Sequence, residues 1–287
     1  MRTHRNKILS LILAILISWS CVEIIDLELP QSDLELVIEG KLLNEESLQT
    51  IKISESLNYY DSSELAPFKD AEVNLMDHQH NIIESFIYSH EDSLYRSASP
   101  IKLAVGKEYV LQIEAKGEIL EAKGKIFENA TLDSLFYLSA EELKSIGKPV
   151  FGDGYFMFVN GELNNQGIEY FKLDVTVNGY FRNGKNDFTN SILTSEYFGR
   201  KFQALPIPGS FEEEDAVVLE LYSINKDVYQ YFDEFRNLFA NDGGVFSPPP
   251  VNPTSNIKNL TNPDNKPLGY IQFSSVQRRN IKIEERD

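Results

Sequence analysis

Short segments in which apolar and polar residues alternate recur along the chain from residue 34 onward. A period of two predicts β-strands that bury one face. In the segment LVIEGKL at 36–42, Leu36 and Ile38 lie on one face and Glu39 lies on the other. The same pattern predicts further strands at 51–53, 71–75, 109–113, 155–159, 171–177, 217–221 and 268–276.

The strands before residue 128 are separated by polar and glycine-containing turns. These turns lie at 44–47, 77–81, 105–107 and 116–118. Short strands that follow one another with no convincing helix are typical of a β-sandwich. We therefore expect a first domain, over residues 34–127, that is a β-sandwich.

The second part of the chain, residues 128–287, contains most of the 14 tyrosines and 18 phenylalanines. It is predicted to be a second β-rich domain with one or two helices. Ser139 and Glu142 have the spacing of a capping box, which predicts a short helix that ends near Gly147.

A longer helix is predicted at 226–240. Val228, Phe232, Phe235 and Phe239 recur at steps of three and four residues, which gives the helix one apolar stripe. Such a stripe is expected to pack on a sheet. The proline-rich stretch 247–253 follows and must be extended, because proline fixes φ and lacks an amide donor.

The N-terminus has the layout of a secretory signal. Basic residues precede an apolar run at 8–17, which is too short to span a bilayer, and Ser20 precedes Cys21, the only cysteine of the chain. This arrangement resembles the bacterial lipoprotein signal, in which the cysteine is acylated and becomes the first residue. We expect a signal peptide at 1–20, lipidation at Cys21 and a lipidated tether at 21–33. The alternative is an ordinary signal with an incidental cysteine.

The chain is acidic, with a formal net charge of −17. Such a charge disfavours binding to nucleic acid and to anionic lipid headgroups. Without cysteines after residue 21, the folded body cannot form disulfides and must be stabilised by its apolar cores.

Four stretches together resemble one family. They are Cys21 with its acidic followers, LVIEGKL at 36–42, KDAEVNLMD at 69–77, and the closing segments NPTSNI and LGYIQFSS between 252 and 275. The chain resembles a functionally unassigned family of Bacteroidota lipoproteins, commonly encoded beside TonB-dependent receptors of the SusC type. The first strands also resemble immunoglobulin-like, carboxypeptidase-regulatory-like sandwiches. The resemblance implies an outer-membrane lipoprotein, facing the cell exterior or the periplasm, with a receptor as partner.

No catalytic motif is recognisable. The sequence lacks a Gly-x-Ser-x-Gly elbow, a glycine-rich phosphate loop and a cysteine in the body, and its histidines after residue 21 lie together at 78–90. The chain is therefore predicted to be non-catalytic and to need no cofactor. His78 and His80 fall in a predicted hairpin turn, which favours a solvated turn over a metal site.

The remaining candidates each have a simpler alternative. The run Glu212, Glu213, Glu214 and Asp215 is either a cation site or a solvated acidic loop. Tyr155, Tyr180 and Tyr197 are either a platform for sugars or core aromatics. Ser93 and Ser134 lie in Asp-Ser-Leu triplets that resemble O-glycosylation acceptors of Bacteroidota. Pro248, Pro249, Pro250 and Pro253 either contact a partner or form an internal crossover.

Three functions remain open at this point. The first is an accessory lipoprotein of an outer-membrane import complex. The second is a freestanding adhesin or glycan-binding protein, and the third is a hydrolase of unrecognised type. The resemblance favours the first.

Overall fold

The structure is a computed structural model. It describes residues 34–58, 63–150, 152–164, 167–182, 184, 191–197, 199–240 and 249–284, with the side chains of 239 and 240 excluded. The predicted signal peptide, the tether and Cys21 lie outside these residues. The described residues from 34 to 57 and from 63 onward belong to one compact unit.

The described part of the chain is mainly β, as predicted. The first strands are β1 (Leu36–Leu43), β2 (Thr50–Glu55), β3 (Glu72–Asp77), β4 (Ile82–Ser89), β5 (Leu94–Ser97), β6 (Glu108–Ala115) and β7 (Glu118–Lys125). The later strands are β8 (Thr131–Ser139), β9 (Tyr155–Glu162), β10 (Tyr170–Val177), β11 (Tyr180–Phe181), β12 (Ile192–Thr194), β13 (Lys201–Pro206), β14 (Ala216–Ile224), β15 (Ile257–Asn259) and β16 (Leu268–Lys282). Helix α2 spans Ala140–Ser145, α4 spans Lys226–Ala240, and a 3-10 turn, η1, spans Ser195–Tyr197.

Both predicted helices are confirmed. The hydroxyl of Ser139 accepts from the amide of Glu142, whose carboxylate accepts from the amide of Ser139, so the capping box of α2 is complete. Helix α4 has the predicted bounds. Its stripe packs as expected where it is described, since Val228 and Phe232 are buried.

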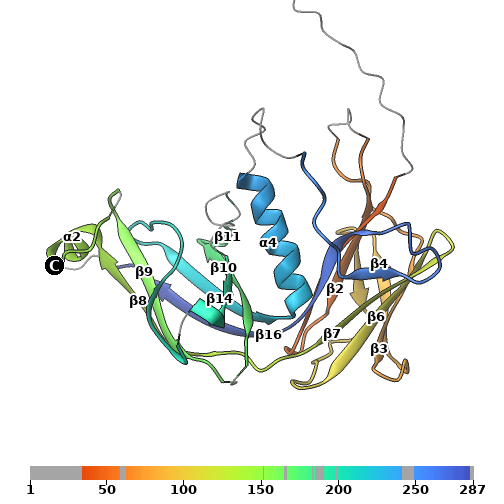
Figure 1. Cartoon of the computed structure of the whole chain (residues 1–287), viewed down its shortest axis with the longest axis horizontal. Coiled ribbons are helices and arrows are strands. Elements are labelled where there is room, and N and C mark those ends of the chain that lie inside the picture. The colour runs from red at the N-terminus through yellow and green to blue at the C-terminus, as the bar shows by residue number, and fades with distance from the viewer. Residues whose placement is uncertain are drawn as a thin grey trace, which may run out of the picture. The chain divides into compact units, whose positions relative to one another are not determined.

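Strand β16 connects the two parts of the large sheet (Figure 1). Its first half, residues 268–274, pairs in parallel with β1. Its second half, residues 275–282, pairs in the antiparallel sense with β14. A side chain on Gly269 would collide with the carbonyl of Ile38, so glycine permits the close approach of β16 to β1. The C-terminal strand thus belongs to both parts of the fold.

The first lobe consists of β1–β7, β15 and residues 268–274. Its sheet curls so that β1, β2 and β16 share one apolar core with β3, β6 and β7. Ile257, Ile271 and Phe273 come from the C-terminal region and are buried in this core. Residues near both ends of the sequence therefore build the first lobe, and the domain boundary expected at 127/128 stays a prediction.

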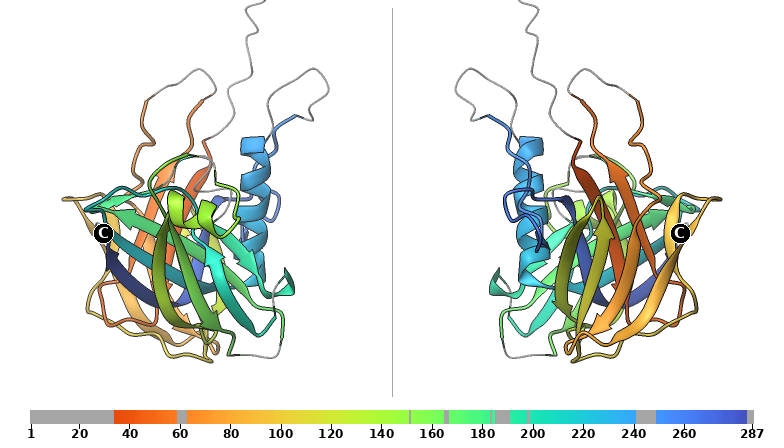
Figure 2. Two further views of the ribbon diagram at one scale, coloured as in Figure 1. Left: turned by 90° about the vertical axis from the view of Figure 1, so that its left-hand side faces the viewer. Right: turned by 90° about the vertical axis from the view of Figure 1, so that its right-hand side faces the viewer.

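The second lobe consists of β8–β14 and residues 275–282. A small sheet, in the order β13, β9, β8, packs over β10 and β14, and their facing side chains form a second core. In the left view of Figure 2 the strands of the small sheet face the viewer, with α2 at one end of them. Helix α4 lies on the opposite face of the large sheet, against β10, β12 and β16.

Asparagine side chains join segments that no strand pairing connects. Asn225 bonds to the amide and carbonyl of Lys125 and to the carbonyl of Phe273, at 3.1 Å each. Asn256 accepts from the amide of Ile271 at 2.9 Å and donates to its carbonyl at 2.8 Å. A primary amide has the donor and acceptor of a peptide group, so these side chains satisfy backbone groups where the sheet has no neighbouring strand.

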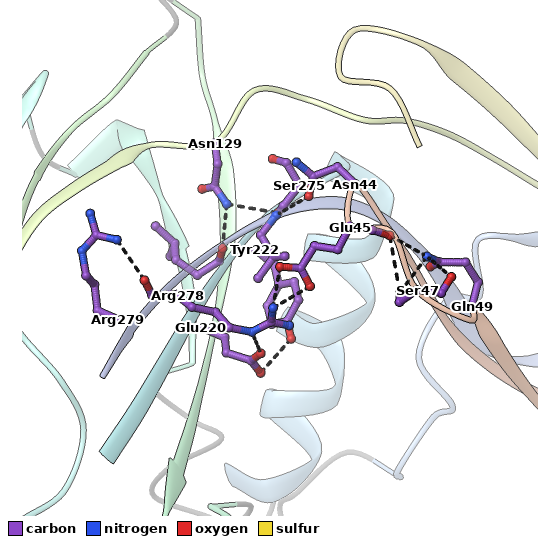
Figure 3. A network of polar contacts seen from close by, with 12 residues as sticks. Asn44, Glu45, Ser47, Gln49, Asn129, Glu220, Tyr222, Ser275, Arg278 and Arg279 are labelled. Carbon is purple, nitrogen blue, oxygen red and sulfur yellow. Dashed lines mark hydrogen bonds and ion pairs between the residues drawn. The ribbon is translucent and has the colours of Figure 1, made fainter. Parts of the chain in front are cut away.

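Asn129 occupies the junction of the two lobes (Figure 3). Its amide donates to the carbonyls of Leu221 on β14, at 2.6 Å, and Ser275 on β16, at 3.0 Å. Its oxygen accepts from the amide of Ala130 at 2.9 Å. All of these bonds are buried, so losing them leaves buried polar groups without partners.

Replacing Asn129 by alanine should lower the free energy of unfolding by about 2 kcal/mol, because buried carbonyls lose their donors. Urea unfolding followed by circular dichroism measures the change. The matched control is Asn81→Ala, which removes an exposed hydrogen bond to Asp77 and should cost less than about 1 kcal/mol. Equal losses in the two variants would contradict a special role for the junction.

Candidate functional site

A buried charged layer lies between α4 and the sheet. Lys172 and Asp174 on β10 are 5% and 3% exposed. They point away from the second core, and α4 packs on the face of β10 to which they belong. Asp174 forms an ion pair with Lys172 and a second with Lys41 on β1, with 2.6 Å between Nζ of Lys41 and Oδ2 of Asp174. One carboxylate thus joins two ammonium groups from the two lobes.

Aromatic rings cover these charges. The ammonium of Lys172 lies 5.2 Å from the ring centre of Phe232 on α4 and 6.0 Å from that of Phe181. The ammonium of Lys41 lies 4.7 Å from the ring centre of Tyr222. These are cation–π distances, so the rings stabilise both cations, and the packing around Lys172 also excludes water, whereas Lys41 stays partly exposed.

The pKa shifts follow from this packing. Burial opposes ionisation of Asp174, but the ammonium groups of Lys172 and Lys41 outweigh it and hold the pKa of the carboxyl below its ordinary value. Burial of Tyr231 on α4 raises its pKa to about 12, so its hydroxyl stays neutral. The layer therefore contains one ionised carboxylate, which is paired with two cations, and phenols that stay neutral.

Two polar side chains of β16 complete the layer. The amide of Gln272 and the hydroxyl of Ser274 are fully buried and find no hydrogen-bond partner among the described residues. Gln272 is the register partner of Lys41 on β1. Lys172 and Asp174 are paired and buried beneath α4, so this layer positions the helix on the sheet.

An open apolar groove lies on the other side of the second lobe. We call it the α2 groove, and its volume is about 610 Å³. It is lined by Phe136, Leu138, Leu143, Ile146, Lys148, Pro149, Val150, Phe156, Met157, Phe158, Ala204, Pro206 and Ile207. Its floor is the outer face of the small sheet and its wall is α2 with the segment that follows.

The floor of the α2 groove is aromatic. The rings of Phe136 on β8 and Phe158 on β9 stack with 5.6 Å between their centres. Phe156 projects from the same face of β9, since strand side chains alternate. Among the lining residues that the structure describes, Lys148 is the only one with an ionisable side chain. The groove is therefore suited to binding apolar matter and has no acid–base pair.

Sequence reasoning missed both sites. The signal for the groove was the segment YFMFV at 155–159, which is apolar on both faces of a strand. A strand of this kind needs a cover on each face or else leaves an apolar surface. The charged layer gave no signal, because alternating Lys172 and Asp174 indicate a solvent-facing side.

Two of the four acidic residues at 212–215, Glu214 and Asp215, have separate side-chain partners. Asp215 accepts from Asn178 at 2.7 Å and from the amide of Glu212 at 2.8 Å, and Glu214 pairs with Lys282 at 2.5 Å. Across the described residues, no three His, Cys, Asp or Glu side chains are placed to hold a metal ion. The structure thus does not bring this run together as a cation site.

The histidines and tyrosines are placed in different surroundings. His78 and His80 lie in the turn between β3 and β4, as predicted, and Nε2 of His80 lies 3.0 Å from the carboxylate of Glu121. Tyr155 packs edge-on against Tyr137. Tyr180 and Tyr197 are 80% and 84% exposed, so these two tyrosines remain available to a ligand.

The two serine candidates are accessible to different degrees. Ser134 is exposed on β8, and its hydroxyl accepts from Asn160 at 2.9 Å. Ser93 is half-buried in a turn with a φ of 60°. Modification at either serine stays a prediction.

The proline-rich segment is partly described. Pro248 lies outside the described residues, Pro249 and Pro250 are exposed, and Pro253 borders a groove of about 750 Å³ beside β15. Thr254 donates its amide to Glu234 of α4 at 2.6 Å. The segment is thus attached to the fold after residue 253, whereas Pro249 and Pro250 are exposed to solvent.

Comparison with known proteins gives a family match. A family model described as "Domain of unknown function (DUF4249)" matches residues 22–280. No curated protein matches the sequence. Within the described residues, no helix has the length and apolar character needed to span a membrane.

Replacing Asp174 by asparagine should destabilise the protein by about 3–5 kcal/mol, because it leaves Lys172 buried without a countercharge. The pKa of Asp174 is lowered in the folded state, so its contribution is present above the unfolded value of about 3.9 and is lost as the pH falls below it. The difference from the wild type, measured by urea unfolding, should therefore shrink at acid pH.

The control for this prediction is the double variant Lys172→Met with Asp174→Leu. Apolar residues of similar size remove both buried charges and should recover most of the lost stability. A single variant as stable as the wild type at neutral pH would contradict the assignment.

Proposed function

We propose that this chain, which belongs to the DUF4249 family, is a lipid-anchored, non-catalytic binding protein of a TonB-dependent import system in the outer membrane. Cys21, placed directly after the apolar run and Ser20, supports the anchor. Two or three acyl chains on one cysteine would hold the body firmly at a bilayer surface. The resemblance to Bacteroidota lipoproteins supports the cell exterior as its location.

The α2 groove is the observation that carries the binding role. It is a preformed apolar hollow, and loops and edges of rigid sheets are common sites of recognition. Its described lining has one lysine and no carboxylate, histidine or hydroxyl, so it offers no nucleophile with a base. Binding of cargo explains such a surface better than turnover does.

Contact with the receptor is assigned to the exposed prolines. Pro249 and Pro250 project from an extended segment, which loses little conformational entropy on binding. Attachment of the following residues to α4 and to Ile271 fixes where these prolines lie. The segment therefore combines a partner-binding part with a structural part.

A second candidate function is a freestanding glycan-binding protein. Exposed Tyr180 and Tyr197 favour it, because sugars stack on accessible aromatic rings. This alternative needs no receptor, so isolation of the protein from its membrane separates the two functions.

Substituting Cys21→Ser should release the exported protein from the membrane fraction, because the site of acylation is lost. Cell fractionation should show at least a tenfold fall in the membrane-bound share of the protein. Mass spectrometry of the N-terminal residue should show that its acylation is lost. The matched control, Ser20→Ala, keeps a small residue before the cysteine and should remain membrane-bound. Acylation or fractionation unchanged by Cys21→Ser would refute the anchor.

The wild-type protein, solubilised in mild detergent, should co-purify an outer-membrane barrel, and Pro249→Ala with Pro250→Ala should reduce recovery of the barrel several-fold. The control is Pro100→Ala, an exposed proline of the first lobe. Thermal unfolding should be unchanged in all variants, since these rings are solvent-exposed. Recovery of the lipoprotein alone from wild-type membranes would refute the import role.

A further inference from the structure

The α2 groove combines an apolar interior with one cation. Phe136, Phe158 and Pro206 belong to the three strands of the small sheet, and Ile146 lies opposite on the wall. Ile146 is 62% exposed, so a substantial apolar surface remains in contact with water. The volume of about 610 Å³ falls within the usual range for small-molecule sites.

Lys148 lies in the lining with no acid paired to it among the described residues. Its backbone amide donates to the carbonyl of Leu143 at 2.9 Å, which fixes its place beside α2. Glu142, on the same helix, is engaged by its capping box. The ammonium of Lys148 thus places a positive charge beside an apolar hollow, in a chain with a net charge of −17. Its complement is a ligand with an apolar body and an anionic end.

We propose that the α2 groove binds a long-chain acyl ligand with an anionic head group. The acyl chain of the ligand lies between the stacked phenylalanines and Ile146, and its anionic head group pairs with Lys148. This inference rests on the proposed binding function, for which it names the class of cargo. A glycan fits this groove poorly, because the described lining has no side-chain acceptor and one donor for its hydroxyls.

The chain length of the ligand should control its affinity. Each methylene buried in an apolar site strengthens binding about fourfold, so two methylenes strengthen it roughly fifteenfold until the groove is filled. The charge of the head group should matter separately, because only the anionic form pairs with Lys148.

The experiment uses the full mature chain carrying Cys21→Ser, purified without detergent, and isothermal titration with decanoate, dodecanoate and 1-dodecanol. Dodecanoate should bind about fifteenfold more tightly than decanoate. Lys148→Glu should weaken dodecanoate at least tenfold and leave 1-dodecanol within about twofold. Ile146→Asp should weaken both ligands at least tenfold.

Ile87→Asp is the matched control. Ile87 is 64% exposed on β4 of the first lobe, so this variant adds the same charge at a similarly exposed apolar position away from the groove. It should bind dodecanoate as the unsubstituted chain does. Circular dichroism should show native content in all variants, because the changed side chains are exposed.

Two outcomes would overturn the inference. One is no binding of dodecanoate, whether or not the protein captures an apolar peptide or a phosphatidylcholine vesicle in its place. The other is equal weakening by Ile146→Asp and Ile87→Asp. A chain that co-purifies a barrel without binding dodecanoate refutes only the acyl ligand, whereas one that binds dodecanoate without a barrel refutes only the import role.

Discussion

The parallel pairing of β1 with β16 is the constraint on which the rest of the structure depends. It joins Val37 to Leu268 in register across nearly the whole described sequence. Such a contact has a cost in loop-closure entropy, which the apolar contacts that it brings into the first core must offset. The first lobe receives Ile271 and Phe273 from this pairing. It therefore cannot complete its core from the N-terminal strands alone.

The same strand determines what lies beneath α4. Side chains alternate along β16, so Ile271 and Phe273 enter the first core while Tyr270 and Gln272 face the helix. The neighbouring β1 adds Lys41 to that face, and Lys41 forms an ion pair with Asp174 on β10. An ion pair thus crosses between the lobes under the helix. Because removing Asp174 would leave Lys172 buried without a countercharge beneath Phe232, α4, β1 and β10 are coupled energetically.

Sequence pattern predicted both helices and the regularly alternating strands, since alternation and capping depend on neighbouring residues, but it did not predict β4, β5, β8 or β13. It did not predict the pairing of β1 with β16, because periodicity indicates a strand but not its partner. Lys172 and Asp174 show the same limit, for a polar face indicates solvent until a helix covers it. In the site, Tyr180 and Tyr197 were proposed from sequence, whereas the α2 groove needed three strands and a helix to come together.

Two lysines in the second lobe show why chemistry follows from surroundings and not from residue type. Lys172 is sealed between β10 and the ring of Phe232, and its charge is balanced by Asp174. Burial lowers its pKa, against the opposing field of that carboxylate, and any ligand would first have to displace α4. Lys148 is exposed beside an apolar hollow and has no acid paired to it among the described residues. An incoming anion needs no rearrangement to reach it. The cargo-binding site that we propose therefore lies on the face of the second lobe that α4 does not cover.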